Sequence, residues 1–386
     1  MRTTFVLLHV PNPRMNKRIG LMKKFGDCSV LSFRRKIYDL WEPEHQDVPH
    51  KILPLDLPSA EKPLGRALGS LRMRRQIACE LKTTNPDCVY TAGLDALMGV
   101  IPYKRSCGAK VVYEVADLRN LHLATARNPL KRFVQRAVSR LERRLLSDVD
   151  LIVVTSKKYY DEYYARFIDP DKVIFVPNVP DPAPFHAYQK KNSGPFTVGY
   201  IGGIRYLEQM KMLVDAAERA GARVFFAGGG ETQECYEELV RYCDGKSHVE
   251  FTGTYSYESD VADLYGRADC IYSVYDASIP NVRIALPNKL YESILCELPI
   301  LAAKGTYLSE LVEEWGVGLS VDCESVDELE CVLRRLMDDA SLNQALGAAL
   351  KKAIGYADFN SVDDALAQKI AAVTACSATP SVAEFV

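Results

Sequence analysis

The sequence predicts an α/β protein of two domains, each built on a doubly wound, mostly parallel sheet. Two observations lead to this fold class. The chain has 386 residues, which is long for one hydrophobic core and suits two. Short β-rich runs alternate with helical patterns through the first half, and the alternation begins again after a polar, proline-rich segment. Such alternation is typical of parallel sheets that are covered by helices on both faces.

The first domain is expected to span residues 1–183. Its strands are predicted at residues 4–10, 28–33, 51–57, 87–92, 110–115, 150–156 and 172–178. Helical periodicity fills residues 15–26, 63–85, 129–147 and 157–167. A buried first strand explains the apolar N-terminus better than a signal peptide does, because no small-residue cleavage site follows it.

Residues 184–195 are interpreted as an interdomain linker, since they are rich in Pro, Lys and polar residues. A second domain is expected over residues 196–356. Its strands are predicted at residues 196–202, 223–229, 248–253, 270–275, 299–303 and 318–322. Residues 357–386 are expected to form a closing helix that returns to the first domain, followed by a tail. Both domains are thus Rossmann-like, and ligands are expected in the loops after the strands.

The charge of the chain is unevenly distributed. Residues 1–183 contain 31 Lys and Arg against 20 Asp and Glu, a balance of +11, and the remainder contains 17 against 30, a balance of -13. A basic half favours an anionic partner, but no nucleic-acid motif or internal repeat accompanies it. The eleven cysteines are scattered and indicate reduced, cytoplasmic thiols. No run of residues reaches the ~20 apolar positions that span a bilayer.

Two glycine clusters follow predicted strands of the second domain. Gly202 and Gly203 precede Arg205, and adjacent glycines at a strand-to-helix turn allow backbone N–H groups to approach an anion. Arg205 is a candidate to reach a phosphate there. Gly229 lies in the second cluster, where three glycines permit a phosphate or a ribose to approach. A plain turn beside a surface arginine is the alternative in both cases.

The segment 287–303, PNKLYESILCELPILAA, is the most informative. Pro and Asn288 indicate the start of a helix. Lys289 lies in the first turn, where a cation opposes the helix dipole unless an anion binds beside it. Glu292 follows three residues later on roughly the same face, where it is suited to accept ribose hydroxyls. The residues alone therefore indicate a nucleotide site, and an exposed Lys–Glu pair is the alternative.

This segment resembles the signature helix of the retaining glycosyltransferases of family 4, which have the GT-B fold, in the branch with the pattern P-[NS]-K-L-[YF]-E. Its flanks are similar as well: VGYIGGIR, FFAGGGE, HVEFTGTYSYESDVADLYGRADC and GVGLSVD. The resemblance is strong over residues 195–340. It is looser over 1–183, where PRMNKRIGLMKKFG, VVYEVADL and LLSDVDLIVVTS correspond to runs of the family's first domain.

The resemblance implies a set of site residues. The donor diphosphate would be held by Gly202, Gly203, Arg205 and Lys289, and the ribose by Glu292. The base would lie against the loop that contains Thr254 and Tyr255, with Gly229 and Asn288 completing the donor site. Arg205, Lys289 and Asp117 are the candidates for catalysis. We expect no cofactor and no metal, because the donor is a substrate and no paired-carboxylate loop is suited to a metal.

Two positions depart from the family pattern. Ile284 stands where the family often has a first glutamate, and Ala116 stands where many members have a histidine. Asp117 is beside Ala116 at the end of a strand, where it is a candidate to orient hydroxyl groups, and an N-cap is its alternative role. Both departures bear on how the sugar is recognised.

The predicted helix 129–147 is amphipathic and strongly basic. Its basic positions include Arg132, Arg136, Arg140 and Arg144. Such a helix can lie on an anionic membrane surface, and a core-facing helix with a solvated basic edge is the alternative. We accordingly expect a cytoplasmic protein, with peripheral attachment to the inner face of the cell membrane as a further hypothesis.

These observations predict a glycosyltransferase that moves a sugar from a UDP- or GDP-linked donor to a lipid-linked or polysaccharide acceptor, with retention. Two alternatives stay open. One is a nucleotide-sugar 2-epimerase of GT-B shape, which needs a cluster of carboxylates and histidines. The other is a non-catalytic nucleotide-sugar binder, which the replacements at Ile284 and Ala116 favour.

Overall fold

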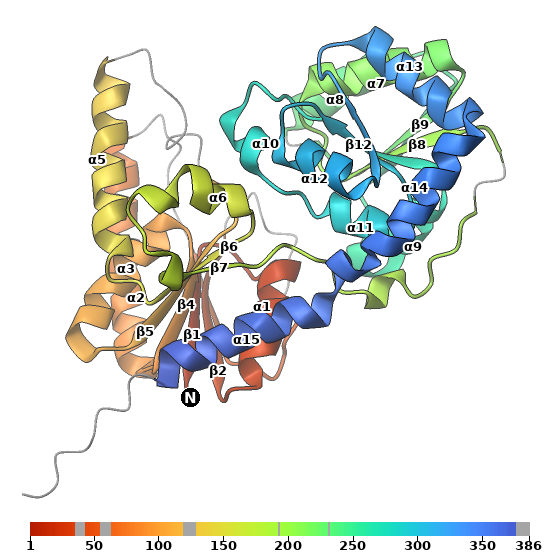
Figure 1. The fold of residues 1–386 in the computed structure, drawn as a ribbon. Helices are drawn as coiled ribbons and strands as arrows, with labels where there is room; N and C mark the ends of the chain where they lie inside the picture. Colours follow the sequence, from red (N-terminus) through yellow and green to blue (C-terminus); the bar gives the residue numbers. More distant parts are fainter. Residues whose placement is uncertain (35–42, 55–62, 119–128, 192–193, 231, 376–386) are drawn as a thin grey trace, which may run out of the picture. The chain divides into compact units, whose positions relative to one another are not determined.

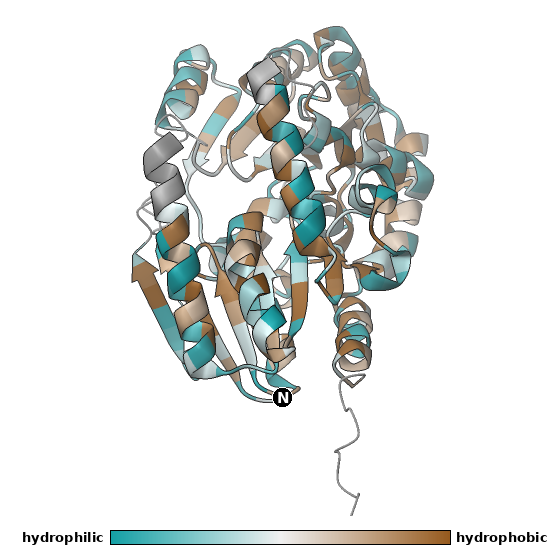
Figure 2. Cartoon of the chain, turned by 90° about the vertical axis from the view of Figure 1, so that its left-hand side faces the viewer, coloured by the Kyte–Doolittle hydropathy of each residue, from teal (hydrophilic) through white to brown (hydrophobic). Residues whose placement is uncertain are grey.

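The computed structural model describes residues 1–34, 43–54, 63–118, 129–191, 194–230 and 232–375. Contacts divide the chain into two compact units, Met1–Pro177 with Asn360–Val386, and Asn178–Phe359. Each unit contains a parallel sheet with helices on both faces (Figure 1). The predicted fold class is confirmed. Hydrophobic residues lie along the strands, whereas the helices carry both hydrophobic and hydrophilic residues (Figure 2).

The first unit has seven parallel strands in the order β3-β2-β1-β4-β5-β6-β7. They are β1 (Thr3–Leu7), β2 (Cys28–Arg34), β3 (His50–Pro54), β4 (Cys88–Ala92), β5 (Lys110–Val115), β6 (Leu151–Val154) and β7 (Val173–Phe175). Its α-helices are α1 (Pro13–Lys23), α2 (Pro63–Thr84), α3 (Leu94–Cys107), α5 (Pro129–Leu146), α6 (Lys157–Glu162) and α15 (Phe359–Ala375). The strand order reverses between β1 and β4, so ligands are expected at the carboxyl ends of these strands.

The second unit has six parallel strands in the order β10-β9-β8-β11-β12-β13. They are β8 (Thr197–Ile201), β9 (Arg223–Ala227), β10 (Val249–Gly253), β11 (Cys270–Ser273), β12 (Ile300–Ala303) and β13 (Gly318–Val321). Its α-helices are α7 (Leu207–Ala220), α8 (Gln233–Tyr242), α9 (Tyr257–Gly266), α10 (Pro280–Ile284), α11 (Lys289–Leu295), α12 (Tyr307–Trp315), α13 (Val326–Asp338) and α14 (Ala340–Ala353). The order reverses between β8 and β11, which places the expected ligand position there.

Local sequence explains where several helices begin and end. The side chain of Asn12 accepts a hydrogen bond from the N–H of Met15 and caps α1. Thr306 begins α12 with a reciprocal capping box. Gly221 ends α7 in the left-handed conformation, with φ of 78°, which glycine adopts without steric cost.

The helix predicted over residues 157–167 is shorter than expected. Helix α6 ends at Glu162, and a 3-10 turn, Tyr164–Arg166, follows it. The hydroxyl of Tyr163 donates to the buried carboxylate of Glu142 at 2.6 Å, and that of Tyr164 donates to the same group at 3.3 Å. These bonds to α5 fix the backbone in a conformation that the helical pattern alone does not predict.

The segment 184–195, interpreted from sequence as a linker, lies in the second unit. It begins within a 3-10 turn, Ala183–Phe185. The ring of Phe185 is buried, and its centroid lies 6.2 Å from that of Tyr257 and 5.8 Å from that of Tyr265. The start of this segment is therefore packed on the second unit.

The final described helix, α15, packs on the first unit. Leu366 and Ile370 are fully buried in the same cluster as Phe5 and Leu7 of β1. Complete burial of an aliphatic side chain of this size stabilises the fold by about 1.5–3 kcal/mol. The structure therefore joins residues near the C-terminus to the core around the first strand.

Candidate functional site

The predicted donor residues of the second unit gather at the carboxyl end of its sheet. The turn after β8 contains Gly202, whose φ of 140° is unfavourable for residues with a side chain. A Cβ atom on Gly202 would lie 2.8 Å from Nζ of Lys289. The ammonium group of α11 is therefore held directly against the first glycine turn.

The glycine turns after β8, β9 and β10 contact one another through their backbones. The N–H of Gly228 donates to the carbonyl of Gly253 at 2.8 Å, and that of Ile204 donates to Gly229 at the same distance. A Cβ atom on Gly228, whose φ is 132°, would lie 2.2 Å from the carbonyl oxygen of Gly202. Close packing of backbone thus requires Gly228, a residue to which the sequence assigned no separate role.

The N–H groups of the first turn have different partners. Gly202 donates to Ala227 at 2.7 Å, and Ile204 donates to Gly229. Within the described residues the N–H of Gly203, which lies between them and is exposed, bonds to no backbone carbonyl. A ligand at this turn would accordingly meet the N–H of Gly203, whereas Gly202 contributes its lack of a side chain.

Lys289 is a buried cation, only 9% exposed. Its Nζ atom lies 5.4 Å from the ring centroid of Tyr200, on β8, and 5.9 Å from that of Tyr275, which follows β11. Aromatic faces attract a cation but do not neutralise it. Among the residues that the structure describes, Lys289 forms no ion pair with a carboxylate. A buried charge without a counterion is unfavourable, so this position is suited to an anion.

Arg205 and the loop after β10 lie around the same strand ends. Arg205 is exposed, and its Nε atom would be 3.7 Å from a Cβ atom on Gly203. Thr254 is exposed, and its methyl group would be 3.5 Å from a Cβ atom on Gly229. Tyr255 is half-buried, and burial, followed by nearby Glu292, raises the pKa of its hydroxyl.

Glu292 is 3% exposed, and its carboxylate accepts hydrogen bonds from three side chains of the described residues. Its Oε1 accepts from the hydroxyl of Tyr257 at 2.8 Å and from Nδ2 of Asn288 at 2.5 Å, and its Oε2 accepts from the hydroxyl of Tyr265 at 2.6 Å. Burial and the adjacent carboxylate raise the pKa of both tyrosines, so their hydroxyls stay protonated and donate. Sequence reasoning found Glu292 but neither tyrosine.

Asp117 lies in the first unit, beyond the end of β5, and is exposed. Tyr159 is its neighbour, and burial, followed by the charge of Asp117, raises the pKa of the Tyr159 hydroxyl. Ala116 beside it is half-buried, and its carbonyl accepts from Thr155 Oγ1 at 3.0 Å. Ile284, the other departure from the family pattern, is buried at the end of α10.

Glu114, on β5, is fully buried in a cluster that sequence reasoning missed. Its carboxylate lies 3.1 Å from Nε of Arg14 and 3.2 Å from Nε of Arg18, and it accepts a hydrogen bond from Tyr90. Nη1 of Arg18 also lies 3.4 Å from Asp363 of α15. Burial opposes ionisation, but the two arginines hold the pKa of Glu114 below its ordinary value. Glu114 therefore anchors the structure of the first unit.

Helix α5 exposes hydrophobic and basic side chains together. Phe133 is 66% exposed, Val134 is 44% exposed and Leu141 is 39% exposed. The four predicted membrane-contacting arginines are also exposed: Arg132, Arg136, Arg140 and Arg144. At the other end of the helix, Glu142, Leu145 and Leu146 are buried. The last turns of α5 are thus packed into the unit.

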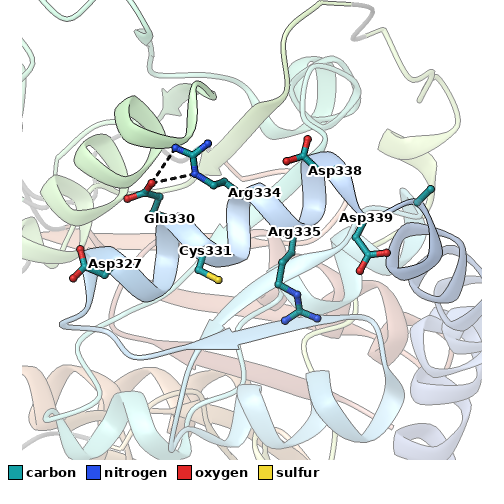
Figure 3. Close-up of a pocket in the computed structure, with 8 residues that line it drawn as sticks. Asp327, Glu330, Cys331, Arg334, Arg335, Asp338 and Asp339 are labelled. Atoms are coloured by element: carbon teal, nitrogen blue, oxygen red, sulfur yellow. Dashed lines mark hydrogen bonds and ion pairs between the residues drawn. The ribbon is translucent and has the colours of Figure 1, made fainter.

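Hollows on the described part of the second unit include the following two. One runs along α13, where Arg334 bonds to Glu330 at 3.0 and 3.1 Å (Figure 3). It contains none of the predicted donor residues. The other, of about 780 Å³, is lined by Tyr206, beside Arg205, and by Asp276 after β11. Within the described ranges, no helix is long and apolar enough to cross a membrane, and no cluster of His, Cys, Asp and Glu is arranged to hold a metal.

Both halves of the chain match glycosyltransferase family models. Residues 183–353 match the family model of the group 1 glycosyl transferases, and residues 27–179 match the glycosyl transferase 4-like domain. The succinoglycan biosynthesis protein ExoL of Rhizobium meliloti is 21% identical over 69% of this chain and 67% of its own length. The O-antigen chain mannosyltransferase C of Escherichia coli is 30% identical over 29% of this chain and 32% of its own length.

Solved structures support the same fold. Anabaena HepE in complex with UDP matches with a TM-score of 0.73 and 16% identity, over 96% of this chain and all of that one. A putative UDP-N-acetylglucosamine 2-epimerase from Listeria monocytogenes also matches, with a TM-score of 0.62 and 14% identity over the whole of both chains. These likenesses show the fold, which is GT-B, and the two family models show glycosyltransferase domains in both halves.

Proposed function

Because both halves of the chain carry glycosyltransferase domains, we propose that the protein transfers a hexose from a UDP- or GDP-linked donor to a lipid-linked or polysaccharide acceptor, with retention. The observation that carries this proposal is the buried ammonium group of Lys289 against the turn of Gly202, with no carboxylate paired to it among the described residues. The diphosphate of a nucleotide-sugar donor is the anion that a glycosyltransferase domain would bind at this ammonium group. The UDP complex of HepE supports the same donor class.

The proposed chemistry depends on stabilising the leaving diphosphate. Negative charge grows on this group as the glycosidic bond breaks, and fixed positive groups lower the free energy of that state. Lys289 and the exposed Arg205 would supply the charge, and the N–H of Gly203 would donate a hydrogen bond. With two cations in this role, the reaction would need no metal ion and no cofactor. Asp117 of the first unit would orient a hydroxyl of the acceptor or of the sugar.

A product assay separates this proposal from its alternatives. The protein is incubated with radiolabelled UDP- and GDP-hexoses, with and without a polyprenyl-diphosphate-linked glycan, and the products are separated by chromatography. A transferase yields a longer glycan, and NMR shows the anomeric configuration of the donor retained. Interconversion of the donor sugar at C2 without glycan growth would identify a 2-epimerase. Binding without either product would identify a non-catalytic nucleotide-sugar binder, the reading that Ile284 favours.

Helix α5 supports contact with an anionic membrane, where a lipid-linked acceptor would be found. An interfacial helix buries apolar side chains among lipid chains while its arginines approach anionic headgroups. The exposed Phe133, Val134 and Leu141, together with the exposed arginines of the same helix, have these two properties. We therefore propose that the protein is cytoplasmic and attaches reversibly to the inner face of the cell membrane through α5.

A further inference from the structure

The hydrogen bonds of Glu292 leave little room for a ligand. A carboxylate offers about four lone-pair positions. The hydroxyl of Tyr257 and the amide of Asn288 occupy those of Oε1, and the hydroxyl of Tyr265 occupies one of Oε2. Counting donors from the described residues, one position therefore remains free. A ribose diol donates two hydrogen bonds, so one of the present donors must leave before both ribose hydroxyls can bind.

The three donors differ in how easily they can leave. Tyr265 is fully buried in the last turn of α9, so its hydroxyl would find no water if the bond were broken. Asn288 precedes Glu292 by four residues at the start of the same helix, so its bond is local. Tyr257 is half-buried at the first residue of α9, directly after the loop expected to contact the base. Tyr257 and Asn288 are both half-buried, and of the two only Tyr257 directly follows the loop expected to contact the base.

We propose that Tyr257 is an internal competitor for the ribose: its hydroxyl occupies Oε1 of Glu292 in the empty site and is displaced by a ribose hydroxyl of the nucleotide. Tyr265 keeps its bond in both states and is a positioning residue that fixes the carboxylate. This inference rests on the proposed function, because it takes a nucleoside diphosphate as the ligand. Beyond that function, it names the hydroxyl of Tyr257 as the displaced group and predicts that removing this hydroxyl raises the affinity for the nucleotide.

Removing a polar group from a binding site usually weakens binding, but here the removal is expected to strengthen it. Removing the hydroxyl of Tyr257 removes a bond that the nucleotide must break, so Tyr257→Phe binds more tightly. One hydrogen bond from a hydroxyl to a charged carboxylate accounts for a change of about tenfold or more. The gain needs the ribose hydroxyls, because a nucleotide without them leaves Tyr257 in place. Tyr265→Phe has the opposite effect, since it releases the carboxylate from its orientation.

The test measures dissociation constants by isothermal titration calorimetry for UDP, GDP and their 2′,3′-dideoxy analogues. The full-length wild type, Tyr257→Phe, Tyr265→Phe and Asn288→Ala are compared. The readout is the ratio of the dideoxy to the ribose dissociation constant, which a general loss of folding does not raise. We expect this ratio to rise about tenfold or more in Tyr257→Phe and to fall in Tyr265→Phe.

Other outcomes overturn the inference. An unchanged or lower ratio in Tyr257→Phe would show that its hydroxyl does not compete with the ribose. A higher ratio in Asn288→Ala alone would make Asn288 the displaced group instead. The proposed function fails separately: if the wild type bound neither UDP nor GDP, the donor site itself would be misassigned. Binding by the wild type with an unchanged ratio in Tyr257→Phe overturns the competition only.

Discussion

The Nζ atom of Lys289 occupies the space that a side chain on Gly202 would need, 2.8 Å from the position of its Cβ atom. The two residues are far apart in sequence, and each belongs to a motif that the sequence singled out. Their contact gives the proposed donor site a specific geometry, in which a buried cation and a side-chain-free turn lie together. Nucleotide binding should therefore depend on the absence of a side chain at Gly202.

Gly202→Ala should weaken binding of the nucleoside diphosphate. The new methyl group displaces the ammonium group, and the φ of 140° is strained for alanine. Loss of one charge-assisted contact corresponds to about 1.5–3 kcal/mol, or at least a tenfold loss of affinity. Gly347→Ala is the control, since Gly347 lies in α14 away from the proposed site, a Cβ atom there would meet nothing within 4 Å and its φ is not positive. Calorimetric titration with UDP and GDP checks both, and equal effects would argue against the geometry.

Glu114→Gln should destabilise the first unit strongly. It leaves Arg18 buried beside a neutral side chain, and breaking a buried ion pair costs about 3–5 kcal/mol. Asp363→Asn is the comparison and should cost less, because burial raises the pKa of Asp363 despite the opposing charge of Arg18. The destabilisation by each variant is measured as the change in the urea midpoint of the first unit, which is monitored by hydrogen exchange of β1 and β5. Similar midpoints would contradict the ranking.

The same cluster predicts a pH dependence. The pKa of Glu114 is lower in the folded chain than in the unfolded chain, so its stabilisation is complete above the ordinary glutamate range and is lost as pH falls through the lowered pKa. Asp363 acts oppositely: its folded pKa is raised, so its contribution declines as pH rises from the ordinary aspartate range through the raised value. Denaturation midpoints of Asp363→Asn should therefore fall less than those of the wild type as pH rises through that window. Parallel profiles would contradict this prediction.

Much of the fold follows from local pattern. The alternation of strands and helices is visible within short windows of sequence, and the structure confirms the two parallel sheets. The ion pair of Arg18 with Asp363 joins residues 345 positions apart, and no local pattern signals it. The motif around Lys289 and Glu292 was visible, but the tyrosines that bond to Glu292 come from α9, where they look like ordinary members of an amphipathic helix.

Metal independence is a further consequence of the proposed site. If Lys289 and Arg205 neutralise the leaving diphosphate, glycan formation should continue at an unchanged rate in excess EDTA. The rate of nucleotide release checks this prediction. It is measured by a coupled assay, and the coupling enzymes are added only after the reaction is quenched so that EDTA does not affect them. Loss of turnover that manganese or magnesium restores would show that a metal supplies the charge.

Attachment to membranes is predicted to depend on α5. Arg136→Gln with Arg140→Gln should reduce co-sedimentation with phosphatidylglycerol vesicles at low salt, since each exposed arginine near an anionic surface contributes at most about 1 kcal/mol. Arg72→Gln with Arg75→Gln, on exposed positions of α2, removes the same charge and should have less effect. Binding by the wild type should weaken as salt screens the surface. Equal losses in both double variants would mean that overall charge, and not α5, attracts the protein.

The central claim is that Lys289 binds the diphosphate of a nucleotide donor, and its most direct test is the affinity of Lys289→Ala for UDP and GDP. Lys304→Ala is the control, because Lys304 is an exposed lysine after β12 that pairs with Glu328, so the loss of charge is the same. Circular dichroism confirms that both variants are folded. We predict that the dissociation constant is at least tenfold higher for Lys289→Ala and is the same as that of the wild type for Lys304→Ala. Unchanged nucleotide affinity in folded Lys289→Ala would contradict the account.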